Sequence, residues 1–212
     1  EGIPVSVSVL DMNWHVTNIA PKYGTGWTGY TWDREKFPAP EKMLQGLHDR
    51  GLHVTLNDHP ADGIRPCEER HADMANKMGD DPALLRSYPY DAADPRYAEA
   101  LAEAVLDPLE RQGVDFWWLD WQQSGGSSDP GMDPLFTLNH TRYLRAACTG
   151  MPPLILSRYA GSGSHRYPLG FSGDTFATWQ SLSFQPFFTA SAANIGFACW
   201  SHDIGGHMHG AY

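Results

Sequence analysis

Two aspartates that follow strand-like segments are the side chains best suited to chemistry. Asp120 ends the apolar run 114–119 and stands among three tryptophans. Asp174 stands in a Gly-Asp-Thr stretch with aromatic residues on both sides. Hydrolysis of a glycosidic bond needs such a pair: one ionised carboxylate attacks or stabilises the anomeric carbon, and one carboxylic acid protonates the leaving oxygen. The alternative role for each aspartate is that of a helix N-cap.

Segments with the alternation of strands and segments with the periodicity of helices follow one another along the chain. We expect strands at 4–10, 52–56, 114–119, 154–156, about 170–171, and 195–199. We expect helices at 40–50, 94–112 and 179–193. In the second helix Asp94 is the expected N-cap and Pro108 the expected kink. This order is typical of a parallel sheet with crossover helices.

Reactive side chains lie at or just past the carboxyl end of each expected strand. They are Asp11, Asp58, Asp120, Arg158, Asp174 and Asp203. Such a series indicates the active face of a (β/α) barrel, where residues from several strand ends converge on one pocket. A doubly wound sheet would normally show a glycine-rich turn after its first strand, and the residues from Asp11 to Trp14 form no such turn.

The expected strands are too few for a closed barrel. About six are found, whereas a (β/α)8 TIM barrel has eight strands and typically about 250 residues. We therefore expect residues 1–212 to be a single catalytic barrel domain that is incomplete and belongs to a larger chain. Because an open barrel exposes sheet edges, association with another copy, as a homo-oligomer, or with further segments is also expected.

Several segments together resemble glycoside hydrolase family 31, the α-glucosidase and α-galactosidase type of retaining enzyme on a (β/α)8 barrel. The matching segments are Ile3-Pro-Val-Ser-Val-Ser-Val-Leu-Asp11-Met, Phe37-Pro-Ala-Pro, Val114-Asp-Phe-Trp-Trp-Leu-Asp120, Leu156-Ser-Arg158-Tyr-Ala-Gly-Ser-Gly, Gly173-Asp174-Thr and Asp203-Ile-Gly-Gly. They appear in the order of the family and span nearly the whole chain.

The resemblance implies a role for five of these residues. Asp120 matches the nucleophile and Asp174 the general acid/base. Asp11 and Asp203 match aspartates that hold sugar hydroxyls, and Arg158 matches an arginine that reaches the substrate and the catalytic carboxylates. The resemblance implies no cofactor and no metal. For a retaining enzyme we expect the two catalytic carboxyl groups roughly 5 to 5.5 Å apart.

Further candidates for substrate contact surround these positions. Asp58 and His59 follow the second strand, Trp121 follows Asp120, Phe171 precedes Asp174, and His207 follows the Asp-Ile-Gly-Gly stretch. For His59 the alternative is a loop histidine bonded to backbone, and for Arg158 a structural ion pair. An apolar wall near Asp174 is expected to raise its pKa, and Arg158 near Asp120 to keep that carboxylate ionised.

The chain departs from the usual family pattern at several positions. Trp121-Gln122-Gln123 replaces Met-Asn-Glu after the nucleophile, Phe171 replaces a common Trp, and His207 replaces an aromatic residue. A histidine that faces the substrate from the last strand of the family barrel has no counterpart here. These differences do not decide which sugar the substrate carries: an α-galactoside or an α-N-acetylgalactosaminide fits as well as an α-glucoside.

Composition narrows the partners and the compartment. With 25 Asp and Glu against 15 Lys and Arg, the chain lacks the clustered cations that nucleic-acid binding needs. No apolar run reaches the roughly 18 residues of a membrane span. The cysteines Cys67, Cys148 and Cys199 indicate neither a disulfide framework nor a zinc site and favour an intracellular compartment. The expected partner is a small carbohydrate.

Two other functions fit the residues. A barrel that binds carbohydrate without cleaving it would keep the fold and lose turnover. A metal-dependent barrel hydrolase would use aspartates and histidines at strand ends, and His207 and His209 are its candidate ligands.

Overall fold

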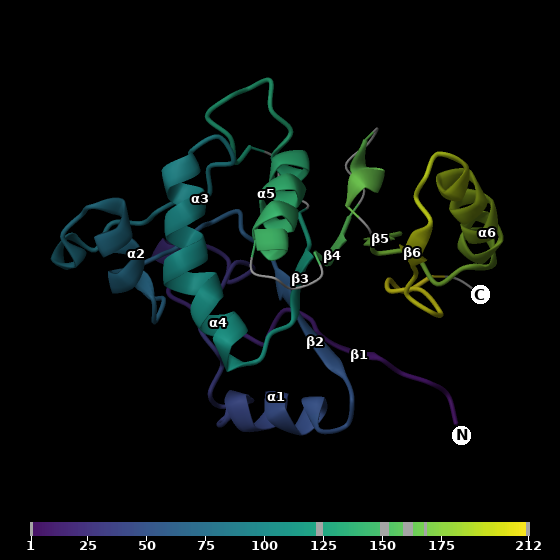
Figure 1. Cartoon of the computed structure of the whole chain (residues 1–212), viewed down its shortest axis with the longest axis horizontal. Coiled ribbons are helices and arrows are strands. Elements are labelled where there is room, and N and C mark those ends of the chain that lie inside the picture. The colour runs from purple at the N-terminus through teal and green to yellow at the C-terminus, as the bar shows by residue number, and fades with distance from the viewer. Residues whose placement is uncertain (1, 122–124, 149–152, 159–162, 168, 211–212) are drawn as a thin grey trace. The chain divides into compact units, whose positions relative to one another are not determined.

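The computed structural model describes residues 2–121, 125–148, 153–158, 163–167 and 169–210 (Figure 1). Gln122 and Gln123, and the stretch 159–162 of the family-like segment that contains Arg158, lie outside the described residues. The chain divides into two units, Glu1–Thr137 and Leu138–Tyr212, which are taken in turn.

Three parallel strands organise the first unit. They are β1 (Val7–Leu10), β2 (His53–Asp58) and β3 (Phe116–Leu119), with β2 in the middle. The register aligns Leu10 of β1 with Leu56, and Asp58 at the end of β2 with Leu119. All three strands therefore end at one edge of this sheet, which is the edge that carries their polar neighbours.

Helical segments connect and cover these strands. They are η1 (Pro21–Tyr23), α1 (Pro40–His48), α2 (His71–Met78), η2 (Pro82–Leu84), α3 (Pro95–Leu101), the π-helical turn Ala102–Leu106 and α4 (Asp107–Gln112). α1 packs against β2 and buries Leu44 completely. The core also contains Val54, Leu56, Leu106 and Leu119, all with no exposed surface.

The long helix of the first unit starts where its sequence indicates and contains a π-helical turn before Pro108. The Asp94 side chain accepts a hydrogen bond from the backbone N–H of Arg96 at 2.9 Å, which confirms the expected N-cap. The π-helical turn lies directly before α4, whose first turn contains Pro108. Proline has no N–H to donate to the preceding turn, and a wider turn at that point accommodates its ring.

The second unit has its own three parallel strands, β4 (Ile155–Ser157), β5 (Leu169–Phe171) and β6 (Cys199–Ser201), with β5 in the middle. Its other elements are η4 (Ser164–Arg166) and α6 (Trp179–Asn194). α5 (Pro134–Cys148) begins in the first unit and continues into the second. Asn139 on α5 accepts a hydrogen bond from Ser157 Oγ at 2.6 Å, which ties this helix to the end of β4.

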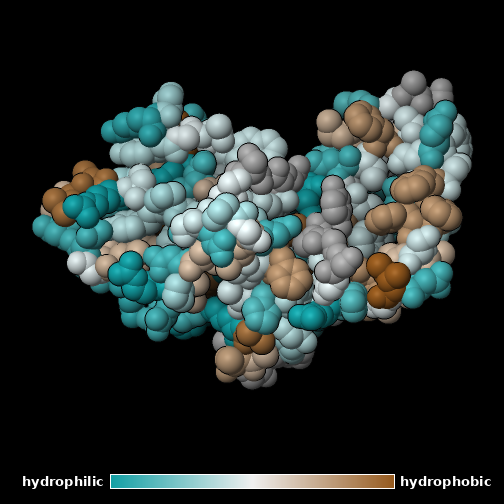
Figure 2. Space-filling view, turned by 90° about the horizontal axis from the view of Figure 1, so that it is seen from above, coloured by the Kyte–Doolittle hydropathy of each residue, from teal (hydrophilic) through white to brown (hydrophobic). Residues whose placement is uncertain are grey.

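Helix α6 carries apolar side chains all round its axis, although most of them are exposed. Thr178 caps its start by accepting a hydrogen bond from the Ser181 N–H at 3.1 Å. Hydrophobic side chains also gather on the surface of the part of the molecule that contains α6 (Figure 2). A helix that is apolar on every side is typical of a buried position.

The structure corrects the predicted bounds of the first and last strands and adds the helices α2 and α5 to those expected above. The first strand begins only at Val7. The last strand, expected at 195–199, runs from Cys199 to Ser201. The apolar residues before Cys199 form the turn after α6, because Gly196 takes a left-handed φ of 97° and the Phe197 N–H returns to the Ala192 carbonyl.

All three cysteines are exposed and free of disulfides. In the part of the chain that the structure describes, none of the helices has the length and apolar character needed to cross a membrane.

Candidate active site

Asp120 lies directly after β3 with only 4% of its surface exposed. Its backbone N–H donates to the Asp58 carbonyl at 3.0 Å, which continues the sheet and fixes where its carboxylate lies. A carboxylate withdrawn from water must be held by polar partners, since an unpaired buried charge is costly. We therefore expect polar side chains to contact the Asp120 carboxylate, which is not exposed to solvent.

Two residues of the β2 end contact the same oxygen of Asp120. The Asn57 side-chain amide donates to Asp120 Oδ2 at 3.0 Å. His59 Nε2 lies 3.0 Å from that oxygen, a contact that becomes an ion pair when the imidazole is protonated. Asn57 and His59 are two positions apart in an extended segment, so their side chains lie on the same face of the sheet, where both contact Asp120.

His59 is 4% exposed, and its ring is nearly perpendicular to the Trp27 ring, with the ring centroids 5.3 Å apart. Neither ring nitrogen of His59 bonds to the backbone among the described residues, because Nδ1 has no hydrogen-bond partner there and Nε2 faces Asp120 Oδ2. The alternative of a loop histidine bonded to backbone is therefore wrong.

Asp58 and Asp11 lie at the same edge of the first sheet and differ in burial. Asp58 is 2% exposed and accepts a hydrogen bond from the Tyr30 hydroxyl at 2.6 Å. Asp11 follows β1, is exposed, and accepts a hydrogen bond from the Met12 N–H at 2.6 Å. The Asp11 carboxylate is thus exposed to solvent, whereas the Asp58 carboxylate is buried and binds the Tyr30 hydroxyl.

Trp121 forms a packed wall next to Asp120. It is 7% exposed, and its ring lies against Tyr90 with the centroids 5.2 Å apart. A Cβ atom at Gly126 would come within 2.4 Å of the Trp121 ring, so this ring and the chain at Gly126 leave no room for a side chain there.

In the second unit, Asp174 is held by Arg158. The Arg158 Nη2 donates to Asp174 Oδ1 at 2.9 Å, and the side chains are 10% and 36% exposed, respectively. The Arg158 guanidinium also stacks over the Phe171 ring at 5.0 Å. Arg158 was expected near Asp120, with an ion pair as the alternative; the structure pairs it with Asp174, and the Phe171 ring lies against the cation. Asp174 is not an N-cap, because Thr178 caps α6.

Asp203 and His207 lie beside Asp174. One ligand-type atom from each of the three residues lies within 4.8 Å of the others, and all three side chains are exposed. His207 Nδ1 is 3.8 Å from Asp203 Oδ2. This is the group among the described residues that could hold a metal ion. Exposed acidic groups of this kind also occur without one, and Arg158 already offsets the charge of Asp174.

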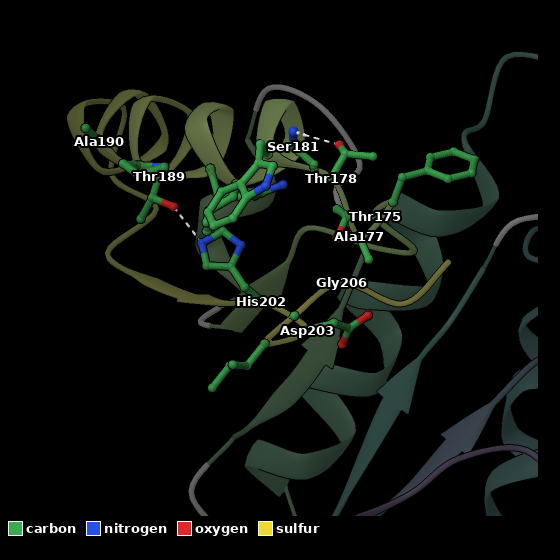
Figure 3. Close-up of a pocket in the computed structure, with 16 residues that line it drawn as sticks. Thr175, Ala177, Thr178, Ser181, Thr189, Ala190, His202, Asp203 and Gly206 are labelled. Carbon is green, nitrogen blue, oxygen red and sulfur yellow. Dashed lines mark hydrogen bonds between the residues drawn. The ribbon is translucent and has the colours of Figure 1, made fainter. Parts of the chain in front are cut away.

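A cavity of about 690 Å³ extends from Asp203 along α6 (Figure 3). Its lining is mostly apolar and includes Phe176, Trp179, Leu182 and the 202–206 segment. His202 contacts both α6 and the segment after β5: its Nε2 lies 2.7 Å from Thr189 Oγ1, and its Nδ1 lies 3.1 Å from Ser172 Oγ. Sequence analysis did not single out His202.

Each unit thus gathers part of the predicted site. The first unit brings Asp58, His59 and Trp121 to the strand ends around Asp120, and the second brings Arg158, Phe171, Asp203 and His207 to the region of Asp174. Sequence analysis missed Asn57 and Tyr30 as partners. A signal for Asn57 existed: Thr55 and Asn57 alternate with the buried apolar residues Val54 and Leu56 in β2, and His59 continues the polar positions just beyond the strand.

The sequence model of a family described as the glycosyl hydrolases family 31 TIM-barrel domain matches residues 1–211. The chain belongs to glycoside hydrolase family 31. The resemblance seen in the sequence is confirmed, and with it the (β/α) barrel class. The six parallel strands of the described residues make this family 31 barrel incomplete, as expected.

Relatives agree with this assignment. The 1,3-α-isomaltosidase of Kribbella flavida is 24% identical over 202 residues, 80% of this chain and 27% of the relative. An α-xylosidase structure from Xanthomonas citri matches 97% of this chain and 25% of its own with a TM-score of 0.68 at 20% identity. The cycloalternan-degrading enzyme of Trueperella pyogenes, in complex with cycloalternan, matches 97% and 33% with a TM-score of 0.67 at 20% identity. This family 31 chain thus spans about a quarter to a third of the length of these proteins.

Proposed function

We propose that this chain supplies the catalytic machinery of a retaining α-glycoside hydrolase. The observation that carries the proposal is the buried carboxylate of Asp120, which the Asn57 amide and His59 contact through one oxygen. A carboxylate that is oriented in this way has the fixed position that attack on a sugar carbon requires.

In the first step, Asp120 attacks the anomeric carbon while the bond from that carbon to the leaving oxygen breaks. Asp174 donates its proton to that oxygen, so the aglycone leaves as an alcohol and the sugar remains as an ester on Asp120. In the second step, Asp174 accepts a proton from water, which attacks the same carbon and releases Asp120. Two inversions retain the configuration. Arg158, which donates to Asp174 Oδ1 at 2.9 Å, orients this side chain for both proton transfers.

The substrate class is a terminal α-linked sugar of the glucose, galactose or N-acetylgalactosamine type. The names of the relatives add xylosides and isomaltosides to the candidates. Asp11, Asp58 and Asp203 are proposed to bind sugar hydroxyls, and Trp121, Phe171 and His207 to shape the pocket. Carboxylates suit this purpose because they accept hydrogen bonds from hydroxyl groups.

The test is turnover of chromogenic α-glucosides, α-xylosides, α-galactosides and α-N-acetylgalactosaminides by the full-length protein that contains this chain. We expect activity on one of these sugars and retention of configuration in the product, observed by NMR. Asp120→Asn should abolish turnover of every substrate. Asp174→Asn should lose most activity on substrates with a poor leaving group and less on those with a good one, because a good leaving group needs little protonation.

The outcomes separate the three functions. If the folded protein binds a sugar but cleaves none of the chromogenic substrates, the result would favour a carbohydrate-binding barrel. Activity that a chelator removes and Zn²⁺ restores would favour a metal-dependent hydrolase built on Asp174, Asp203 and His207. Activity that is insensitive to chelation and lost in Asp120→Asn supports the proposal.

A further inference from the structure

Trp27 is an exposed aromatic side chain on a loop that is fixed on both sides. Its side chain is large and apolar, yet 44% of its surface is exposed. The residues that follow it are buried: Thr28 is 1% and Tyr30 3% exposed. A rigid backbone that presents an aromatic ring to solvent is suited to binding, because little conformational entropy is lost when a ligand packs on the ring.

The buried side chain of Arg65 anchors this loop. Arg65 is 2% exposed and lies outside the strands. Its Nη1 donates to the Tyr23 carbonyl at 2.8 Å, and its Nη2 donates to the Thr28 carbonyl. The two carbonyls flank Trp27 on either side. The Asp62 N–H adds a hydrogen bond to Thr28 Oγ1 at 3.0 Å.

Glu68 completes the anchor. Its Oε1 accepts from Arg65 Nη2 at 2.9 Å, and its Oε2 accepts from the Tyr30 N–H at 3.1 Å and the Thr31 hydroxyl at 2.7 Å. The backbone around Trp27 is also tightly packed, since a Cβ atom at Gly26 would lie 2.0 Å from the Thr17 carbonyl oxygen. These contacts hold the chain before and after Trp27 and leave the ring itself exposed.

The ring of Trp27 is connected to Asp120 through one residue. It meets the His59 ring at 5.3 Å with an interplanar angle of 82°, and His59 Nε2 lies 3.0 Å from Asp120 Oδ2. His59 thus contacts both the exposed aromatic ring of Trp27 and the buried carboxylate of Asp120. A sugar that meets Asp120 with its anomeric carbon is within reach of this surface, because a pyranose is comparable in size to an indole ring.

We infer that Trp27 is a sugar-stacking platform beside Asp120, and that Arg65 and Glu68 hold its loop in position. The C–H groups of a sugar face pack on an aromatic face, where the negative π-surface meets their partial positive charge. The inference rests on the proposed function, because it takes the region of Asp120 as the sugar site. It adds the residue that binds the sugar face, whereas the aspartates bind hydroxyls.

The test measures sugar binding separately from turnover. Full-length Asp120→Asn protein is titrated by calorimetry with the p-nitrophenyl α-glycoside that the native protein cleaves or, if it cleaves none, with each glycoside of the panel. We expect Trp27→Ala in this background to weaken binding about tenfold, the size of one aromatic stacking contact, and Trp27→Phe to recover part of the loss. In the otherwise native protein Trp27→Ala should raise KM with a smaller effect on kcat, because the platform contributes similarly to ground state and transition state.

Tyr23→Ala is the matched control. Tyr23 is an aromatic residue of the same loop, but its ring contacts Lys22, and only its backbone carbonyl takes part in the anchor. Tyr23→Ala should bind as the parent does, with thermal unfolding unchanged in both variants. Equal weakening in the two variants would indicate a general disturbance of the loop and overturn the inference. Unchanged binding in Trp27→Ala would overturn the platform and leave the proposed function intact. If the parent binds none of the sugars, both the proposed function and the inference fail.

Discussion

His15 is a histidine that the fold keeps away from water. It is 1% exposed and packs edge-on against Trp14 at 5.3 Å. Its Nδ1 lies 3.2 Å from the Val16 carbonyl, so this nitrogen carries the proton in the neutral tautomer that donates there. Burial lowers the pKa of His15, and among the charged groups that face it, Glu68 opposes this effect while His59 and Arg65 add to it.

The lowered pKa predicts a pH dependence of stability. In the unfolded chain His15 takes up a proton as the pH falls through about 6.5, whereas the folded chain resists protonation until a lower pH. Folding stability from this residue is therefore present above about pH 6.5 and is lost below it. We expect the free energy of unfolding, measured with urea, to decrease as the pH is lowered from 7 to 5.5. His15→Asn should reduce the slope of this free energy against pH by up to about 1.4 kcal/mol per pH unit.

The exposed histidine His209 supplies the comparison for this measurement. His209→Asn should keep the slope of the native chain, since His209 is exposed in the folded protein and is not withdrawn from water by folding. Equal slopes for His15→Asn and the native chain would show that burial of His15 does not determine the acid sensitivity.

At the scale of elements, the loop between β1 and α1 depends on one buried ion pair. The side chains of Arg65 and Glu68 are 3% and 5% exposed. Glu68→Gln keeps the shape and removes the charge, which leaves the Arg65 cation with Asp62, a partner at 3.4 Å that is 40% exposed. Breaking a buried pair from one side typically costs about 3 to 5 kcal/mol, so we expect that loss in the free energy of unfolding measured with urea.

Glu69→Gln tests whether the loss comes from the buried pair. Glu69 is adjacent in sequence but exposed, so its substitution should change stability by less than about 0.5 kcal/mol. Similar effects of the two substitutions would mean that net charge, and not the buried contact, explains the change. Glu68→Gln should also weaken sugar binding, because the loop that carries Trp27 loses two acceptor contacts.

The sequence predicted the elements better than it predicted their contacts. Apolar runs and helix caps act over a few residues, so the strand ends at Asp11, Asp58 and Asp120 were identifiable. The contact of Asn57 with Asp120 spans 63 positions, and that of Tyr30 with Glu68 spans 38. Local propensity carries no information about such pairs, which depend on how strands align in the sheet. The start of β6 was misplaced for a different reason, since an apolar run containing a glycine fits a strand and a turn after a helix equally well.

At the scale of the whole molecule, the second unit exposes several large apolar side chains of one helix. On α6, Trp179 and Phe187 are each 68% exposed, Leu182 is 59% and Phe184 is 52% exposed. Beside them, β6 is paired with β5 on one side, and within the described residues no other named strand is paired with it. An apolar helix next to an open strand edge favours contact with a further layer of protein.

This surface predicts that the 212-residue chain associates with itself when it is produced alone. Burial of apolar area drives the contact, at roughly 25 cal/mol per Å², and the open edge of β6 adds a strand to pair with. Sedimentation velocity should show the average mass rising with concentration in the micromolar range. Phe187→Lys should shift the chain toward monomer, because a charge on α6 would have to be desolvated in the contact.

Leu84→Lys changes a side chain that is 55% exposed in the first unit and should leave association unchanged. A chain that stays monomeric at every concentration, or one that responds equally to both substitutions, would show that α6 is not the contact surface.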